Sequence, residues 1–290
     1  MGKVAFVFPG QGSQFVGMGK DWAEGFLEEA DRILGFDLKK ICWLGPEEEL
    51  KRTEIQQPAI LTISAAAYEL LKKKGLKPEV VAGHSLGEYS ALVAAGSIKF
   101  ADAVKIVHLR GRFMQEAVPQ GVGAMAAVLG ASRDKIMEIC RQVGGVQLAN
   151  LNGPDQVVIS GLAGSVAAAG QKLKEAGAKR IIPLPVSAPF HSQLMEPAAQ
   201  KLKAEMDKIE IRNAVIPVMD NVIADYVTEG TRIRELLIKQ VTGSVLWEDS
   251  VRKMIADGVS TFIEVGPGKV LSGLIKKIAP EAEVKTYNET

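Results

Sequence analysis

The chain has 290 residues, about twice the 150 residues usual for one domain, so one large core or two unequal domains are both possible. Hydrophobic residues make up 47% of the chain and charged residues 24%, which excludes a disordered chain, a coiled coil and a collagen-like repeat. The net charge is +1, from 35 Lys and Arg against 34 Asp and Glu. This balance excludes a global field that would attract nucleic acid or a membrane surface.

The apolar stretches of the sequence are too short to cross a membrane. The longest weakly polar runs, Tyr89–Ile98 and Gly121–Ala131, fall short of the ~20 residues that a membrane helix needs. Near the N-terminus the apolar run is only Val4–Phe8, and it breaks at Pro9-Gly10 without a cleavage-like region. We therefore expect a cytoplasmic protein without a membrane partner, whose first residues form a buried strand.

Cysteines and histidines are few and scattered. The two cysteines, Cys42 and Cys140, lie far apart and outside any Cys-x-x-Cys arrangement, which favours two inert thiols over a disulfide framework. The three histidines, His84, His108 and His191, are also too far apart in the sequence to form a local metal motif. No metal site is expected.

Residues 1–120 alternate between short β-rich runs and helical patterns. The predicted strands and helices are, in chain order, Val4–Phe8, Asp21–Leu34, Ile60–Lys73, Val80–Ala82, Leu86–Ala95 and Asp102–Ala117. This alternation is typical of a parallel sheet covered by helices.

From Gly121 the pattern changes to strand, helix, two strands, helix and strand. The predicted elements are Ala124–Leu129, Ser132–Val143, Val146–Leu151, Gln156–Ser160, Ser165–Ala176 and Arg180–Leu184. This βαββαβ order is the ferredoxin-like one. We therefore expect a small subdomain at residues 121–187, inserted in a larger α/β domain made of residues 1–120 and 188–290. Beyond the insertion the sequence predicts a helix at Ala198–Lys208 and a strand at Thr261–Val265.

Gly83-His84-Ser85-Leu86-Gly87 matches the pattern G-x-S-x-G, in which a serine lies on a tight turn between a strand and a helix. A predicted strand precedes the motif, and apolar residues at helical spacing follow it. At that helix N-terminus, free N–H groups can stabilise an oxyanion, with the amide of Leu86 as one donor. The alternative is a serine N-cap with glycines that serve packing. Because strand, motif and helix agree, we favour Ser85 as a nucleophile.

Arg110 fills a gap in the apolar stripe of the predicted helix that contains it. The stripe consists of Ala103, Val107, Met114 and Ala117. A buried arginine keeps its charge, so it needs an internal carboxylate, a cluster of carbonyls or an anionic ligand. On periodicity alone, a structural salt bridge and a clamp on a ligand carboxylate both stay open.

A serine nucleophile needs a base, and the three histidines are the candidates. His84 is adjacent to Ser85 and should point away from it, and His108 falls on the predicted solvent side of its helix. His191 ends the proline-shaped loop 186–191, where a rigid loop can present a side chain to a neighbouring turn. His191 is therefore the best candidate by elimination.

Neither glycine-rich loop fits phosphate binding. The loop that starts at Gly10 would need glycine where Phe15 stands for a dinucleotide fingerprint, and lysine where Met18 stands for a P-loop. Gly266-Pro267-Gly268-Lys269 lacks the earlier glycine and the following Ser or Thr of a P-loop. Nucleotide hydrolysis is disfavoured.

Five motifs in chain order resemble those of the malonyl-CoA:acyl carrier protein transacylase family. They are Phe8-Pro9-Gly10-Gln11-Gly12-Ser13-Gln14, Gly83-His84-Ser85-Leu86-Gly87-Glu88, Leu109-Arg110-Gly111 with Met114-Gln115, Ala188-Pro189-Phe190-His191, and Glu264-Val265-Gly266-Pro267-Gly268. The resemblance runs through nearly the whole chain. It implies a hydrolase-like α/β large domain with an inserted ferredoxin-like small subdomain. It also implies transfer of malonyl from malonyl-CoA to the phosphopantetheine thiol of acyl carrier protein, for fatty acid synthesis.

The resemblance implies catalytic roles for individual residues. Ser85 is implied as the nucleophile, His191 as its base and Arg110 as the clamp on the malonyl carboxylate. The amides of Leu86 and Gln11 are implied to form the oxyanion hole. Together these roles imply a ping-pong reaction through a malonyl-serine ester, without a metal or other cofactor.

Four further positions match family residues. Gln240 matches the position whose backbone carbonyl holds the catalytic histidine. Asn150 and Asn152 match asparagines that line the cleft from the small domain, although turn formation is an alternative role for them. Phe190 resembles the malonyl-selective pattern, in which a smaller residue accompanies use of methylmalonyl.

Two alternatives from other functional classes stay open. A serine hydrolase would place a carboxylate beside its histidine, and Asp102, Asp134 and Asp155 are weak candidates for that role. A non-catalytic scaffold that binds acyl carrier protein would keep the fold without the chemistry. No heptad pattern or apolar patch indicates an oligomer, and we expect a monomer.

Overall fold

The computed structural model describes residues 2–186 and 188–290. Within these residues the large sheet has six strands in the order β10-β9-β1-β2-β7-β8. The strands are β1 (Lys3–Phe8), β2 (Val80–Gly83), β7 (Val218–Met219), β8 (Tyr226–Val227), β9 (Val259–Glu264) and β10 (Glu283–Thr286). Neighbouring strands from β10 to β7 pair in parallel, which confirms the predicted parallel sheet. The edge strand β8 is antiparallel to β7, so the sheet is mixed.

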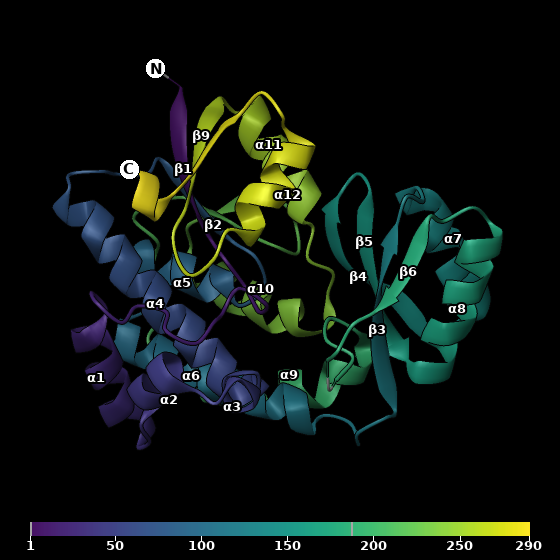
Figure 1. Cartoon of the computed structure of the whole chain (residues 1–290), viewed down its shortest axis with the longest axis horizontal. Coiled ribbons are helices and arrows are strands. Elements are labelled where there is room, and N and C mark those ends of the chain that lie inside the picture. Colours follow the sequence, from purple (N-terminus) through teal and green to yellow (C-terminus); the bar gives the residue numbers. More distant parts are fainter. Residues whose placement is uncertain (1, 187) are drawn as a thin grey trace.

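Helices from both ends of the chain cover this sheet. They are α1 (Glu24–Leu34), α2 (Leu38–Leu44), α3 (Glu47–Leu50), α4 (Thr53–Lys73), α5 (Gly87–Ala94), α6 (Phe100–Glu116), α9 (Glu196–Met206), α10 (Gly230–Thr242), α11 (Trp247–Ala256) and α12 (Val270–Ile278). Two short 3-10 helices are η1 (Gln193–Met195) and η2 (Tyr287–Glu289). In Figure 1, α11 and α12 lie beside β9, whereas α4, α5 and α6 lie below and to the left of them.

Alternate residues of β1 point to the two faces of the large sheet, because side chains alternate along a strand. Phe6 and Phe8 belong to a core cluster with residues of α4, α5 and α6. Ala5 and Val7 belong to a second cluster with residues of α11 and α12. All four side chains are fully buried. The central strand is thus apolar on both faces, as expected for a parallel sheet with helices on each side.

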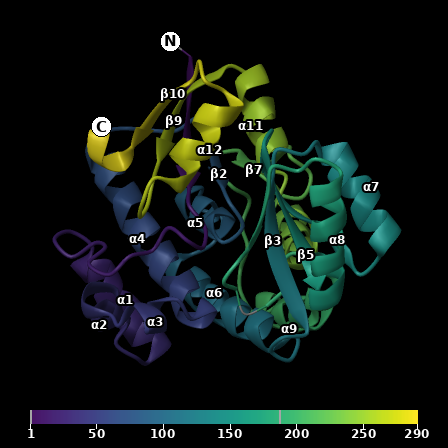
Figure 2. The same cartoon turned by 45° about the vertical axis from the view of Figure 1, so that its right-hand side comes forward.

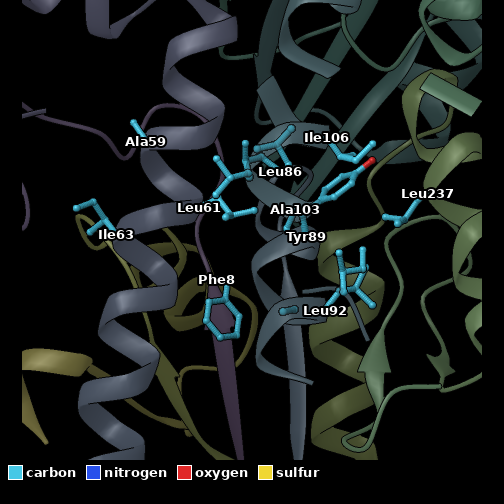
Figure 3. Packing of buried hydrophobic residues seen from close by; sticks show 14 of the residues in the cluster. Phe8, Ala59, Leu61, Ile63, Leu86, Tyr89, Leu92, Ala103, Ile106 and Leu237 are labelled. Atoms are coloured by element: carbon cyan, nitrogen blue, oxygen red, sulfur yellow. The ribbon is translucent and has the colours of Figure 1, made fainter. Parts of the chain in front are cut away.

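Helix α5 is buried in the first core cluster, and its packing fixes the turn that precedes it. Figure 3 shows Leu86 at the start of this helix, with Tyr89 and Leu92 further along, among side chains of α4 and α6. All three side chains are fully buried. The residue just before Leu86 is Ser85, so the core of the large sheet determines where this serine lies.

A second, four-stranded sheet occupies residues 123–183, in the order β4-β5-β3-β6. Its elements are β3 (Gly123–Leu129), α7 (Arg133–Val143), β4 (Val146–Gly153), β5 (Gln156–Leu162), α8 (Ala163–Glu175) and β6 (Arg180–Pro183). All pairs are antiparallel. This order and direction confirm the predicted ferredoxin-like fold.

The small sheet has two different apolar faces. Val128 and Ile159 pack in a cluster with residues of α7 and α8, which lie on its outer side in Figure 2. Met125, Ala127 and Val158 belong instead to the core cluster of the large sheet. The small sheet is therefore packed onto the large part of the molecule by its own apolar side chains.

Helix α4 begins at Thr53, seven residues before the predicted start at Ile60. The sequence prediction was wrong here because Pro58 lies inside the helix. Proline has no N–H, so the carbonyl of Glu54, four residues earlier, loses its usual helical donor. The Nδ1–H of His108 donates to this carbonyl at 2.8 Å. His108 is consequently half-buried, which corrects its predicted place on the solvent side of α6.

Most predicted elements are present with ends shifted by a few residues, but several elements were not predicted. The unpredicted elements are α2, α3, β7, β8, α10, α11, α12 and β10. Among the described residues, no helix is both long and apolar enough to cross a membrane.

Candidate active site

Ser85 lies on the turn between β2 and α5 with a left-handed φ of 52°. Non-glycine residues rarely adopt this conformation, and it is typical of strained functional turns. A Cβ atom on Gly83 would come within 1.9 Å of the carbonyl carbon of Gly87. A Cβ atom on Gly87 would come within 2.0 Å of the carbonyl oxygen of Phe8 in β1. Close backbone packing therefore requires both glycines of the motif, and they hold the serine just beyond the carboxyl end of β2.

The side chains of Ser85 and His191 are in hydrogen-bond contact. Ser85 Oγ is 2.7 Å from His191 Nε2, and His191 Nδ1 is 2.8 Å from the backbone oxygen of Gln240. A carbonyl oxygen only accepts, so Nδ1 carries the ring proton and a neutral Nε2 accepts from the serine hydroxyl. Burial, together with the charge of Arg110, lowers the pKa of His191 to about 3. The imidazole is thus neutral and available as a base at neutral pH.

The histidine loop is as constrained as the serine turn. His191 is 4% exposed and has a left-handed φ of 56°. The preceding residue, Phe190, is also buried. The carboxylates of Asp102, Asp134 and Asp155 do not contact this histidine among the described hydrogen bonds, and a backbone carbonyl occupies the position that a triad carboxylate would take.

Arg110 reaches the same serine from α6. Its guanidinium donates from Nη1 to Gln57 Oε1 at 2.8 Å, and from Nη2 to Gln240 Oε1 at 2.9 Å and Ser85 Oγ at 3.2 Å. The guanidinium carbon also lies 5.5 Å from the ring centroid of Tyr89. Arg110 is fully buried, and within residues 2–186 and 188–290 no carboxylate pairs with it. The structure therefore holds a buried positive charge whose hydrogen-bond acceptors are all neutral.

The backbone amides of Leu86 and Gln11 have no acceptor among the hydrogen bonds between described residues. Leu86 is the N-cap of α5, where the helix dipole favours negative charge. Gln11 follows β1 on the loop that packs on the serine turn, and its side chain donates to Gln56 Oε1 at 2.5 Å. Two free donors at this edge of the sheet fit an oxyanion hole.

The two asparagines of β4 are both buried, but they differ in their contacts. Asn152 Oδ1 is 2.8 Å from His84 Nε2, which links the small sheet to the residue beside the serine. The ring of His84 also packs edge-on against Trp247, with 5.6 Å between the ring centroids. This histidine therefore points away from the serine hydroxyl, as predicted. Asn150 forms an isolated backbone bridge with Val245, and its side chain has no hydrogen bond to another described residue.

Sequence reasoning missed several buried polar residues of this site. Gln57 receives a guanidinium N–H of Arg110, and Gln147 donates from Nε2 to the carbonyl oxygens of His191 at 3.2 Å and Thr242 at 3.1 Å. Asn221 accepts the N–H of Ser85 at 2.7 Å and donates to the carbonyl of Gly83 at 2.6 Å. The polar pair Gln56-Gln57 before an apolar helical run was a usable signal.

The side chain of Gln240 also has more contacts than a backbone role requires. Besides accepting from Arg110, it donates from Nε2 to the carbonyl of Ser85 at 3.0 Å and to Glu88 Oε2 at 2.9 Å. Gln240 is fully buried. Gln240 thus has hydrogen bonds to the arginine, the serine and the histidine of the site.

The fold and the site define a serine-nucleophile α/β protein with a buried arginine beside its nucleophile. A family model described as "Acyl transferase domain" matches residues 5–288. The chain therefore belongs to the acyl transferase domain family, and it is an acyltransferase.

Relatives of this chain carry one recurring name. It is 53% identical to malonyl CoA-acyl carrier protein transacylase of Bacillus subtilis (strain 168), over 96% of this chain and 91% of that protein. The protein of the same name from Escherichia coli (strain K12) is 48% identical over 100% of this chain and 97% of that protein.

Solved structures of similar proteins have the same fold. An acyl carrier protein S-malonyltransferase from Vibrio cholerae superposes with a TM-score of 0.96 at 45% identity, over 98% of this chain and 96% of that one. A malonyl-transacylase solved in complex with its type II PKS acyl-carrier protein superposes with a TM-score of 0.96 at 43% identity, over 99% of this chain and 96% of that one.

Proposed function

We propose that this acyltransferase moves malonyl from malonyl-CoA to the phosphopantetheine thiol of an acyl carrier protein, and so supplies extender units for fatty acid synthesis. One observation carries the proposal: Ser85 Oγ lies 2.7 Å from a neutral imidazole nitrogen of His191 and 3.2 Å from the unpaired guanidinium of Arg110. A nucleophile beside a base fits acyl transfer. A buried cation at the same atom fits an acyl group that carries its own carboxylate.

In the first half of the proposed reaction, Ser85 Oγ attacks the thioester carbonyl carbon while His191 Nε2 takes the hydroxyl proton. The amides of Leu86 and Gln11 receive the oxyanion that forms. The carbon–sulfur bond then breaks, the coenzyme A sulfur takes the proton from His191, and a malonyl ester remains on the serine. The carbonyl of Gln240, 2.8 Å from Nδ1, supports the imidazolium between these two proton transfers.

In the second half, the phosphopantetheine thiol gives its proton to His191 and attacks the ester carbonyl. The serine oxygen leaves as the ester bond breaks, and it regains a proton from the imidazolium. The oxyanion is held by the same two amides. Nucleophile, base and donors all come from the chain itself, so these steps call for no metal or other cofactor.

Substrate selection is assigned to three kinds of contact. Arg110 holds the free carboxylate of the malonyl group, and its Nε is a buried donor without an acceptor among the described residues. Phe190 narrows the space beside the base against a branched acyl chain. Asn150 and Asn152 contribute to the cleft from the small sheet. The names of the relatives support malonyl-CoA and acyl carrier protein as partners.

The organisation of the chain is proposed to follow the two sheets. Residues 1–120 and 188–290 would form the catalytic domain, and residues 121–187 the inserted subdomain. The two separate strand orders support this division, whereas the shared core cluster shows that the parts are packed firmly together. We expect a monomer in the cytoplasm.

The intact mass of the protein after mixing with malonyl-CoA, without an acceptor, tests this function. We expect a malonyl adduct on the wild type, little or none with acetyl-CoA, and none on Ser85→Ala. Adding holo acyl carrier protein should remove the adduct and load the carrier. Release of free malonate without an adduct would indicate a hydrolase, and neither product would indicate a non-catalytic scaffold.

A further inference from the structure

Two buried carboxyl groups lie side by side beneath the active site. Glu88 is on α5, three residues after the nucleophile, and Asp220 directly follows β7. They are 1% and 0% exposed, and Glu88 Oε2 accepts the N–H of Asn221, the residue that follows Asp220, at 3.1 Å. Among the described residues, neither carboxyl group has a hydrogen bond to the side chain of Ser85, His191 or Arg110, so the mechanism above gives them no role.

The hydrogen bonds around the pair leave one carboxylate oxygen of Asp220 without a donor. Asp220 Oδ1 accepts the N–H groups of Val222 at 2.8 Å and Ile223 at 3.0 Å. Asp220 Oδ2 is buried and has no donor among the described residues. Glu88 Oε2 accepts from Gln240 and from the N–H of Asn221 at 3.1 Å. Two ionised carboxylates in contact would repel each other, whereas a protonated Glu88 supplies the donor that Asp220 Oδ2 lacks.

We propose that Glu88 keeps a proton at neutral pH and is a positioning residue that orients Gln240 and Asn221 while leaving Arg110 without an ionised partner. The negative charge of the pair then stays on Asp220, where two backbone N–H groups stabilise it. This inference deepens the proposed malonyl transfer and rests on it.

The first consequence concerns the geometry of the site. Because Glu88 Oε2 accepts the Nε2–H of Gln240, the amide of Gln240 can only present its Oε1 to Arg110. Glu88 also holds the backbone of Asn221, whose side chain bonds the N–H of Ser85 and the carbonyl of Gly83. One carboxyl group therefore supports both the cation and the nucleophile.

The second consequence concerns charge. An ionised Glu88 would place a negative charge one amide away from Arg110, and it would compete with the malonate carboxylate for that cation. A neutral Glu88 leaves the guanidinium free for the substrate. Burial and the charge of Asp220 raise the pKa of Glu88 well above its usual range, which agrees with this assignment. Three other charged or titratable groups interact electrostatically with the pair. Arg232 interacts with Asp220, and Arg110 and Tyr89 interact with Glu88.

Infrared difference spectroscopy of the wild type against Glu88→Gln tests for the proton. We expect the wild type at neutral pH to show a carbonyl band of a protonated carboxyl group that is absent from the variant. Glu264→Gln is the matched control, because Glu264 is also buried but accepts three hydrogen bonds, from the N–H of Leu271 and from the N–H and Oγ of Ser272. The control should keep the band. A wild-type spectrum without it would overturn the proposal.

The rate of acylation of Ser85 by malonyl-CoA and acetyl-CoA tests the positioning role. Glutamine at position 88 can donate to Asp220 and accept from Gln240 and Asn221, so Glu88→Gln should keep the malonyl preference within about threefold. Glu88→Leu removes every one of these bonds and should lower the malonyl acylation rate by about 100-fold. A change of tenfold or more in the preference of Glu88→Gln would mean that Glu88 is an ionised partner of Arg110, against the proposal.

Asp220→Asn covers the case in which Glu88→Leu does not fold. An amide at position 220 donates to Glu88 and removes the neighbouring negative charge, so Glu88 should ionise and the malonyl KM should rise about tenfold or more, with little change for acetyl. An unchanged malonyl KM would contradict the proposal. Wild-type protein is measured in the same series. If it forms no malonyl-serine, the proposed function fails, whereas the infrared band still decides the state of Glu88.

Discussion

Arg110 shows how a single buried residue can be costly for folding and useful for chemistry. Taking a guanidinium out of water is unfavourable unless acceptors replace the lost hydration. Here three neutral oxygens, from Gln57, Ser85 and Gln240, and the ring face of Tyr89 supply that replacement. None of them cancels the charge. The residue is therefore prepared for an anionic ligand, and two of its neutral acceptors connect it to the catalytic machinery.

Replacing this residue should change which acyl group is accepted. We expect Arg110→Ala to lower kcat/KM for malonyl-CoA relative to acetyl-CoA by roughly 30- to 5,000-fold, which corresponds to the ~2–5 kcal/mol cost of removing one partner of a buried charge pair. Steady-state kinetics with both donors give this ratio, and Arg112→Ala on the exposed side of the same helix is the control. Equal losses for the two donors would contradict the clamp role.

Single site residues could be predicted from the sequence where the residue type is scarce or stands in an unusual position. Ser85, His191 and Arg110 stood out because of a motif, an elimination among three histidines and a charged residue in an apolar stripe. Gln57 and Asn221 did not stand out, because neutral amides are common and gain meaning only from their partners. Their partners Arg110 and Ser85 are 53 and 136 positions away in the chain and cannot be predicted from local pattern.

At the scale of elements, the small sheet helps to hold the histidine loop. Gln147 on β4 donates to the carbonyl oxygens of His191 and Thr242, and its Oε1 accepts the N–H of Gln193 at 3.1 Å. These bonds join β4 to the loop before η1 and to the end of α10. Because the left-handed backbone of His191 is strained, outside contacts of this kind are needed to keep it in place.

Breaking this connection should slow acyl transfer more than it destabilises the fold. We expect Gln147→Leu to lower the acylation rate by about 10- to 100-fold, because misplacing the base is costly for catalysis. The free energy of unfolding should fall by only ~1–3 kcal/mol, the usual cost of unsatisfied backbone groups. Acylation kinetics and chemical denaturation measure the two effects. Gln142→Leu, at an exposed position of α7, should have the acylation rate of the wild type. If Gln147→Leu also had the wild-type rate, Gln147 would not hold the histidine loop in place.

Long periodic elements were predictable, and short or context-dependent ones were not. The four strands and two helices of residues 123–183 could be predicted from their hydrophobic periodicity, because each has one apolar face. Strands β7 and β8 have only two residues each, so no period can be recognised. They exist because β2 offers an open edge with which β7 can pair. The start of α4 was missed because a histidine from another helix replaces the donor that Pro58 lacks.

At the scale of the whole molecule, buried titratable groups determine how stability depends on pH. Burial lowers the pKa of His84, and burial with the charge of Arg110 lowers the pKa of His191. The unfolded chain protonates both below about pH 6.5 while the folded protein does not, so acid destabilises the fold. Burial raises the pKa of Glu88, so the folded protein keeps a proton that the unfolded chain loses above about pH 4.5.

These opposing effects predict a stability maximum near pH 6.5. Below it the unfolded chain binds protons on both histidines that the folded protein does not bind, so the free energy of unfolding should rise with pH from pH 5 to 6.5. Above about pH 7 the histidines no longer contribute, and the protons kept by buried carboxyl groups such as Glu88 and Glu264 should make it fall with pH. Chemical denaturation across this range measures both limbs. Glu88→Gln should flatten the upper limb and Glu29→Gln, at an exposed site, should not; two identical upper limbs would disprove the linkage.

The sequence by itself determined the class of fold and nominated Ser85, His191 and Arg110 for the site. Alternating strand and helix periods dictate which faces must be buried, and burial of apolar surface dominates folding, so the layered α/β arrangement and the ferredoxin-like insertion follow from pattern. The G-x-S-x-G turn follows from glycines that only close backbone contact requires.

Only the tertiary structure decided how these parts act together. Side chains from α4, α5, α6 and α10 and from the loop after β7 meet at one point, although they are distant in the chain. Hydrogen-bond direction and the unpaired charge of Arg110 depend on that meeting, and so does the proton that we propose on Glu88. Such properties belong to contacts and to the low dielectric around them, and no local pattern of residues encodes either.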